Sequence, residues 1–466
     1  MTWRRFLSAG AGGMAAQAVN LAALPVLTRI FSRDDLGHWA LWLGGALIVG
    51  SVATLRLELA VVTAKEPAEA STLLWVSLAC AACGAGGLVL LTMLPQVRGW
   101  LGAAEVPWLA PLAGLMAFGL SVQLALQAWL TRLGRFMEQS IAQAGLAILG
   151  VGIQIGMGFG LLAPSAPPVL ALVLGSLAGQ GLACVVLVGA CLPRARRPAA
   201  PSRPGAAVRA HRRFPCFSAP YTLFGVLRDR AGLMIFQAYL TPAQVGQYAF
   251  AWRALNFPVG LISGSLRPVI FHDGARHGIT EIGPLVTKLM TLLGLATGIG
   301  MAVFLAMPGD WFALILGPSW RDTGPMGAVM IWGIGSFVLA NWLDRVMDLL
   351  GRQGLTLTME IIFTCLSLGG MLGVFMAGGS MLQAVVAQAV ALTLYNVVYL
   401  VAVYRCAQWP VRELLLALMP GAAAGTCALA AMHVGILMVG PWIALLLVGS
   451  LVAVLLWSFR RRISCG

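Results

Sequence analysis

Residues 168–192 read PVLALVLGSLAGQGLACVVLVGACL and contain no charged side chain. A helix rises about 1.5 Å per residue, so a run of this length reaches across the roughly 30 Å hydrocarbon core of a bilayer. Comparable apolar runs recur from one end of the chain to the other. The stretch therefore predicts a transmembrane helix, and its recurrence predicts a helical membrane protein.

The composition of the whole chain excludes an ordinary soluble protein. Of 466 residues, 59% are hydrophobic and 10% are charged, and the mean hydropathy is +0.88. A soluble domain carries about 25% charged residues, so this chain could not cover a water-facing surface of its size. The net charge of +14 is typical of a membrane protein, because positive side chains gather in cytoplasmic loops and beside anionic lipids. No basic segment is interleaved with aromatic residues, so nucleic acid is not an expected partner.

About fourteen apolar stretches are long enough to cross the membrane, which predicts an all-α polytopic fold. The stretches are residues 6–30, 36–56, 71–94, 107–130, 138–162, 168–192, 217–240, 245–270, 284–306, 325–348, 355–378, 381–403, 414–437 and 441–459. The first stretch is too long for a cleaved signal and is expected to remain as a helix.

The distribution of arginine predicts the orientation of these helices. If the N-terminus is cytoplasmic, most loop arginines fall on the cytoplasmic side, and the opposite loops hold only Arg33, Arg98 and Arg321. This asymmetry predicts that both termini are cytoplasmic. Residues 193–215 hold seven arginines, no acidic residue and no apolar periodicity. We expect this segment to be an exposed, basic cytoplasmic linker.

Matching motifs indicate an internal repeat. A shift of 209 residues aligns two sets of similar residues. The first set is Ser32, Leu36, Gly37, Trp39 and Ala40, and the second is Thr241, Val245, Gly246, Tyr248 and Ala249. Separately, Leu133-Gly134-Arg135 recurs as Leu350-Gly351-Arg352. Because the period is six spans, the repeat predicts two parallel six-helix lobes around a central cavity, residues 1–192 and 216–405. Residues 406–466 would then form two additional helices and a basic tail.

Charged residues inside the apolar stretches indicate a functional site, because each costs at least about 2.5 kcal/mol at the centre of a membrane helix. Arg228, Asp229 and Arg230 lie near the middle of the 217–240 stretch, too deep to reach the interface. Guanidinium binds phosphate oxygens in pairs and keeps its charge, so an arginine-lined cavity would suit a diphosphate. The candidates for substrate binding are Arg228, Arg230, Arg253, Arg29, Arg56 and Arg267.

The alternative is that these arginines form structural ion pairs or interfacial anchors. Arg56 and Glu58 are expected to remain apart, because side chains two positions apart do not face each other on a helix. Glycines at four-residue spacing, Gly152, Gly156 and Gly160 and again Gly294 and Gly298, are expected to allow close helix packing.

Four acidic residues are candidates for coupling transport to a proton or sodium gradient: Asp229, Asp344, Asp348 and Glu360. A carboxylate removed from water can take up a proton near neutral pH, so each could carry an ion. The alternative is a plain arginine–aspartate pair. No metal-ligand spacing, nucleotide-binding loop or catalytic motif is found, and no cofactor is expected. The sequence therefore favours a transporter over an enzyme.

Short motifs stand at the ends of the predicted spans. In the first half they are Thr28-Arg29, FSRDDLG at 31–37 and LRLELA at 55–60. In the second half they are Asp229-Arg230, residues 240–246, Tyr248-Ala249, Arg253, Asn256-Phe257-Pro258 and Gly317-Pro318-Ser319-Trp320. Together these motifs resemble those of bacterial polysaccharide flippases of the Wzx type, and the likeness covers nearly the whole chain.

The resemblance implies membership of the multidrug, oligosaccharidyl-lipid and polysaccharide exporter superfamily, with two six-helix lobes around a central cavity. It implies a flippase in the bacterial inner membrane that moves an undecaprenyl-diphosphate-linked oligosaccharide from the cytoplasmic to the periplasmic leaflet by alternating access. The product would supply lipopolysaccharide O-antigen, capsule or exopolysaccharide assembly. The implied partners are membrane lipids, a polysaccharide polymerase and a chain-length regulator.

Two other functions remain open from the sequence. A cation-coupled multidrug exporter of the same superfamily would line its cavity with acidic and aromatic residues rather than arginine. A membrane-bound glycan polymerase or ligase would need a large periplasmic loop, and the predicted outer loops are short.

The predicted topology places the loop between the 284–306 and 325–348 stretches outside the cytoplasm. In a chain without its native cysteines, Asp310→Cys should react with a membrane-impermeant maleimide in intact spheroplasts. Arg352→Cys, on the cytoplasmic side, should react only after permeabilisation. The reverse pattern would contradict the predicted orientation.

Overall fold

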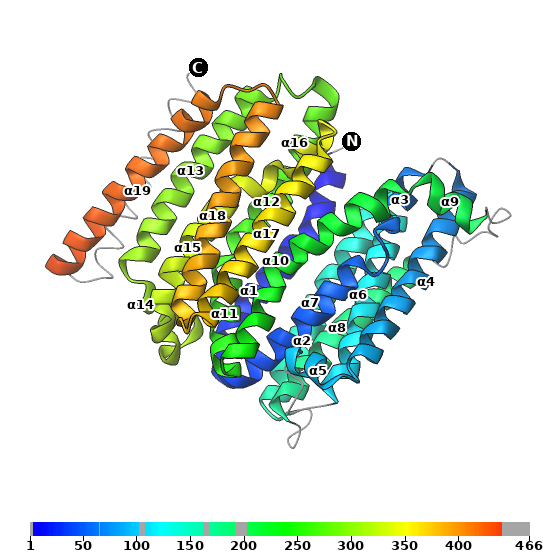
Figure 1. Ribbon diagram of the computed structural model, residues 1–466, viewed down its shortest axis with the longest axis horizontal. Helices are drawn as coiled ribbons and strands as arrows, with labels where there is room; N and C mark the ends of the chain where they lie inside the picture. The colour runs from blue at the N-terminus through cyan, green and yellow to red at the C-terminus, as the bar shows by residue number, and fades with distance from the viewer. Residues whose placement is uncertain (1–2, 65, 102–107, 162–166, 192–202, 440–466) are drawn as a thin grey trace. The chain divides into compact units, whose positions relative to one another are not determined.

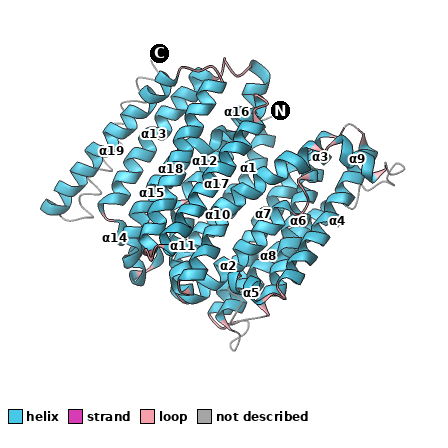
Figure 2. Ribbon diagram, in the orientation of Figure 1, coloured by secondary structure: helices cyan, strands magenta, loops and turns pink. Residues whose placement is uncertain are grey.

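The computed structural model describes residues 3–64, 66–101, 108–161, 167–191 and 203–439. These residues form helices joined by short turns, and no strand occurs among them (Figure 2). Nine helical segments in this part of the chain are long and apolar enough to cross a membrane. The prediction of an all-α polytopic membrane protein is confirmed.

The first half of the chain holds six long helices and two short ones (Figure 1). They are α1 (Trp3–Ile30), α2 (Arg33–Val52), α3 (Leu57–Thr63), α4 (Pro67–Leu91), α5 (Pro95–Trp100), α6 (Leu109–Arg132), α7 (Phe136–Gly158) and α8 (Pro168–Cys191). The short helices α3 and α5 were not predicted, because a search for spans of about 20 residues passes over them.

The described residues of the second half form long helices and several short ones. They are α9 (Pro204–Ala210), η2 (Phe214–Ser218), α10 (Ala219–Tyr239), α11 (Pro242–Leu255), α12 (Phe257–His277), α13 (Gly283–Ala306), α14 (Pro308–Leu316), η3 (Pro318–Thr323), α15 (Gly324–Ala340), η4 (Asn341–Leu343), α16 (Asp344–Leu349), α17 (Gln353–Met376), α18 (Met381–Cys406) and α19 (Val411–Val439).

Each predicted span up to residue 437 corresponds to a helix or to consecutive helices, and the span 441–459 lies outside the described residues. Two spans are interrupted. The 245–270 stretch divides at Asn256, where α11 ends, because Pro258 has no N–H to continue the helical ladder and fits only a first turn. The 325–348 stretch divides at the 3₁₀ turn Asn341–Leu343.

The chain forms two compact units. The first unit is Met1–Ser265 with Arg352–Ala391, and the second is Leu266–Gly351 with Leu392–Gly466. In the first unit α7 packs along α8 and α1, and α6 packs between α4 and α8 (Figure 1). The six-helix lobes 1–192 and 216–405, and the added helices beyond residue 406, stay a prediction.

The residues matched by the repeat adopt the same local structure. Ser32 begins α2 and Thr241 begins α11, each in a capping box with the residue three positions later, Asp35 or Gln244. Both caps satisfy backbone N–H groups that a helix start leaves without partners. The Leu-Gly-Arg motifs agree as well, since Gly134 and Gly351 have φ of 69° and 66°, the left-handed region that ends a helix.

The two matched motifs also contact each other in the first unit. Helices α2 and α11 cross with Gly37 against Gly246 (Figure 1). A Cβ on Gly37 would overlap the carbonyl oxygen of Pro242, and a Cβ on Gly246 would overlap the carbonyl oxygen of Arg33. Glycine at both positions therefore permits the two backbones to touch.

In the second unit, glycines join α13 to α19. A Cβ on Gly298 would overlap the backbone of Gly421, and Gly294 lies against the backbone of α19 at Ala417. This is the close packing that the spacing of these two glycines predicted. Gly152 in the first unit differs, because no neighbouring atom lies within 4 Å of its Cβ position.

The described part of the expected linker is helical. Residues 193–202 lie outside the described residues, but Pro204 begins α9, and η2 leads directly into α10. Ala207 is buried in an apolar cluster with residues of α3 and α4, and Val208 and Phe214 pack against that cluster. This part is therefore helical and anchored through its apolar residues, while most of its residues are exposed, and its role as a cytoplasmic linker between two lobes stays a prediction.

The crossing of α2 and α11 gives a stability prediction. Gly37→Ala should lower the free energy of unfolding by about 1–3 kcal/mol, because the added methyl group meets the backbone at Pro242. Gly86→Ala in α4 is the matched control, since no atom lies within 4 Å of its Cβ position. Unfolding in detergent measures both, and equal stability of the two variants would contradict a close crossing.

Candidate functional site

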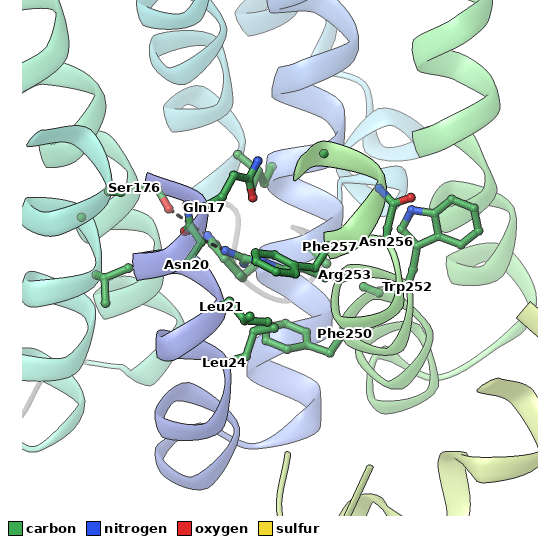
Figure 3. A pocket seen from close by; sticks show the side chains of 18 of the residues that line it. Gln17, Asn20, Leu21, Leu24, Ser176, Phe250, Trp252, Arg253, Asn256 and Phe257 are labelled. Carbon is green, nitrogen blue, oxygen red and sulfur yellow. Dashed lines mark hydrogen bonds between the residues drawn. The ribbon is translucent and has the colours of Figure 1, made fainter. Parts of the chain in front are cut away.

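A cavity of about 390 Å³ lies within the first compact unit. Helices α1, α2, α10 and α11 supply most of its polar and aromatic lining, and α7 and α8 add apolar residues, Gln154 and Ser176. Figure 3 shows residues of α1 and α11 that line it. The polar residues around it are Gln17, Asn20, Gln154, Ser176, Asp229, Arg230, Tyr248, Arg253 and Asn256. The volume falls within the range of sites that bind molecules of drug size.

Arg253 of α11 is held in the cavity by residues from the first half of the chain. Its Nη2 donates a 2.9 Å hydrogen bond to Oδ1 of Asn20 in α1. The guanidinium carbon lies 5.4 Å from the ring centre of Trp39 in α2, within the range of a cation–π interaction. Trp39 is fixed in turn, because its Nε1 donates to Oγ of Ser176 in α8 over 2.9 Å. These neighbours orient Arg253 but supply no negative charge.

Arg230 and Asp229 of α10 line the same cavity. Arg230 therefore shares the cavity with Arg253, so two positive charges belong to its lining. Asp229 is the one acidic residue among the lining residues, and its side chain is 41% exposed. The charged lining thus has two arginines for one carboxylate, which leaves a net positive charge and favours an anionic ligand.

Arg228 points to a different place. Its Nη1 lies 2.6 Å from Oε1 of Glu360 in α17, and its Nε lies 3.3 Å from Oδ1 of Asp229. The Arg228 side chain is 10% exposed and that of Glu360 is 2% exposed. Successive residues of a helix are about 100° apart, so Arg228 and Arg230 face nearly opposite sides of α10. Arg228 therefore joins α10 to α17 and does not line the cavity.

The other three predicted arginines also lie away from the cavity. Arg29 is exposed at the end of α1, and its Nη1 donates to the carbonyl oxygen of Pro25. Arg267, in the second unit, donates to the backbone and side-chain oxygens of Asn341 and forms a 3.0 Å ion pair with Asp344.

The third is Arg56, whose Nη1 lies 3.1 Å from Oε1 of Glu58. The expectation that these residues remain apart is wrong. It assumed a continuous helix, but Arg56 has φ of 56° at the start of α3, and this left-handed residue turns its side chain back over Glu58.

The four acidic candidates occupy different surroundings. Asp229 lines the cavity, whereas Glu360 is paired with Arg228 and Asp344 with Arg267. Asp348 forms an exposed i,i+3 pair with Arg345. Asp344 and Asp348 are four positions apart in α16, and each has its own arginine partner.

Sequence reasoning missed the uncharged half of the cavity. Gln17, Asn20, Trp39, Gln154 and Ser176 carry no charge, so the cost of burying charge in a membrane could not single them out. A signal was present in the first span, where Gln17 and Asn20 are three residues apart and therefore share a helix face.

Comparisons with known proteins agree on the fold. A sequence family described as "Polysaccharide biosynthesis protein" matches residues 26–324. Among solved structures, the inward closed conformation of the lipid II flippase MurJ has a TM-score of 0.74 at 13% identity, covering 98% of this chain and 99% of that one.

Two MATE transporters match less closely. The Vibrio cholerae MATE transporter VcmN, D35N mutant, has a TM-score of 0.59 at 13% identity, covering 86% of this chain and 95% of that one. An inward-facing MATE family transporter of the MOP superfamily has a TM-score of 0.52 at 14% identity, covering 91% and 96%. No curated protein matches this chain by sequence. At these identities the structural matches establish the fold alone.

The buried pair of Arg228 and Glu360 gives a prediction that separates a structural role from ion coupling. Glu360→Ala should lower the free energy of unfolding by about 3–5 kcal/mol, because it removes the buried partner of the guanidinium and leaves only the exposed carboxylate of Asp229. The double variant Arg228→Met with Glu360→Met should regain most of this stability and still transport substrate.

The matched control is Asp348→Ala, which breaks an exposed pair and should cost at most about 1 kcal/mol. Unfolding in detergent and transport are measured on the same preparations. A stable double variant that no longer transports would contradict a purely structural role for the pair.

Proposed function

The chain belongs to the polysaccharide biosynthesis protein family, and on that premise we propose that it is a flippase for undecaprenyl-diphosphate-linked oligosaccharide. It would move this lipid from the cytoplasmic to the periplasmic leaflet of the bacterial inner membrane by alternating access. The product would serve O-antigen, capsule or exopolysaccharide assembly, together with a polysaccharide polymerase and a chain-length regulator. Both termini are cytoplasmic in this proposal.

The observation that carries the proposal is the pair of arginines in one cavity. Arg230 and Arg253 come from consecutive helices and share the cavity with a single carboxylate. A diphosphate offers several anionic oxygens, and two guanidinium groups can bind them in pairs. An anion that lies between the two arginines is attracted to both, so the cavity favours a ligand of this charge.

The way Arg253 is held explains how the cavity could exchange its ligand. Asn20 and Trp39 keep the guanidinium in place without neutralising it, so phosphate oxygens can replace the Asn20 contact at modest cost. The lipid tail would stay in the bilayer while the charged headgroup passes through the cavity. In this proposal Arg253 binds the headgroup, and Asn20 and Trp39 position its guanidinium group.

Alternating access would require the crossing of α2 and α11 to separate. These two helices meet at Gly37 and Gly246, close to the ends that the topology places at the periplasmic side. A contact between glycines has no interlocking side chains to part. In this proposal the crossing closes the periplasmic side until the headgroup is released.

Energy coupling is assigned to Asp229 in this proposal. It is the acidic candidate that lines the cavity, and it adjoins both Arg228 and Arg230 along α10. Entry of a proton or sodium ion would remove or balance its charge and so change the net charge that the headgroup meets.

A cation-coupled multidrug exporter is the second candidate, because the fold is shared with MATE transporters. The net positive charge of the cavity lining argues against it, since a cationic drug would meet two arginines and one aspartate. The short outer segments predicted from the sequence argue against a glycan polymerase or ligase.

Removing either cavity charge should stop glycan export. Arg230→Gln and Arg253→Gln are each expected to lower the transport rate by roughly ten- to a hundredfold, the range for losing a charge-assisted phosphate contact. Surface polysaccharide in cells that depend on this chain, and flipping in reconstituted vesicles, measure the effect.

The matched control is Arg412→Gln, an exposed arginine of the second unit, which should transport normally. Normal export in both cavity variants, with folded protein in the membrane, would overturn the site. Unchanged polysaccharide together with lost drug resistance would favour the multidrug exporter instead.

A further inference from the structure

Residues 203–218 form a fixed surface on the first compact unit rather than a loose connection. α9 rests on α4, and η2 contacts α3. Ala207 is 4% exposed within the α3–α4 cluster. Nε2 of His211 lies 3.2 Å from Oε1 of Glu69 in the first turn of α4. These contacts determine which side of the segment faces outward.

The outward side carries only positive charge. Its exposed charged residues are Arg203, Arg209, Arg212 and Arg213, which we call the arginine surface. Residues 193–218 contain no acidic residue, and Glu69 of the neighbouring α4 lies beside His211. The cavity residues play no part in this surface, which lies on different elements.

The neighbouring helices place the arginine surface at the edge of the membrane. Glu69 lies in the first turn of α4, where a candidate membrane span begins at Pro67. η2 runs directly into α10, whose apolar stretch begins near residue 217. Phe217 is 53% exposed at this point. An exposed aromatic residue beside arginines at the start of apolar helices is typical of the headgroup layer.

We propose that the arginine surface binds the phosphate groups of anionic phospholipids in the cytoplasmic leaflet. A guanidinium group can bind phosphate oxygens through two parallel hydrogen bonds. Each arginine near an anionic membrane also adds an electrostatic attraction to the lipids, which decays over about one Debye length. The site lies beyond the proposed transport function, because it takes a resident lipid and not the lipid-linked glycan. Bound lipid would hold α4 and the start of α10 at a fixed depth in the membrane.

The test is lipid binding by the purified full-length chain in neutral detergent. Native mass spectrometry, titrated with phosphatidylglycerol and separately with phosphatidylcholine, should show a clear preference for phosphatidylglycerol. The triple variant Arg209→Gln, Arg212→Gln, Arg213→Gln should weaken phosphatidylglycerol binding on the order of a hundredfold and leave phosphatidylcholine unchanged. The corresponding triple lysine variant keeps the charge and should retain most of the binding.

The matched control removes three exposed arginines from elsewhere on the predicted cytoplasmic side, Arg352→Gln, Arg405→Gln and Arg412→Gln. This variant should bind phosphatidylglycerol like the unmodified chain. Equal loss in both triple variants would show that only net charge matters and would overturn the site. No lipid preference in the unmodified chain would also overturn it, whether or not any variant folds, and neither result bears on the cavity arginines.

Discussion

The cost of keeping a guanidinium inside a membrane protein governs the arrangement of the first compact unit. Arg228 forms an ion pair with the buried carboxylate of Glu360, which offsets that cost and joins α10 to α17. Arg253 instead contacts the amide of Asn20 and the ring of Trp39, which stabilise the cation without cancelling its charge. One arginine is therefore committed to structure, whereas the other remains available to an anion.

The close contact of α2 and α11 brings the two arginine environments into one unit. Glycine at Gly37 and Gly246 lets the helix backbones touch, so that Trp39 of α2 reaches Arg253 of α11. The same helices begin with equivalent capping boxes at Ser32 and Thr241. Related sequence motifs thus form the contact itself, which explains why the cavity takes lining residues from both halves of the chain.

Much of the fold could be predicted from the sequence, because apolar length alone identifies membrane helices. The candidate site could be predicted only in part. Charge within a span singled out Arg230 and Arg253, which line the cavity, but it also singled out Arg228, which is paired with Glu360. The partner Glu360 is more than a hundred residues away, and no local spacing relates the two. Asn20 and Trp39 could not be singled out by charge, since neutral side chains are tolerated in apolar spans.

The sequence by itself determined the class of fold, the positions of most helices and the family likeness, since each depends on residues close together in the chain. It determined too that charge lies deep in the apolar stretch 217–240. Only the tertiary structure decided which charges are neutralised. That outcome depends on which helix faces which, as with α10 against α17, and on local backbone turns such as the left-handed Arg56 that pairs with Glu58. Long-range packing fixes these relations, and it cannot be read from spacing along one helix.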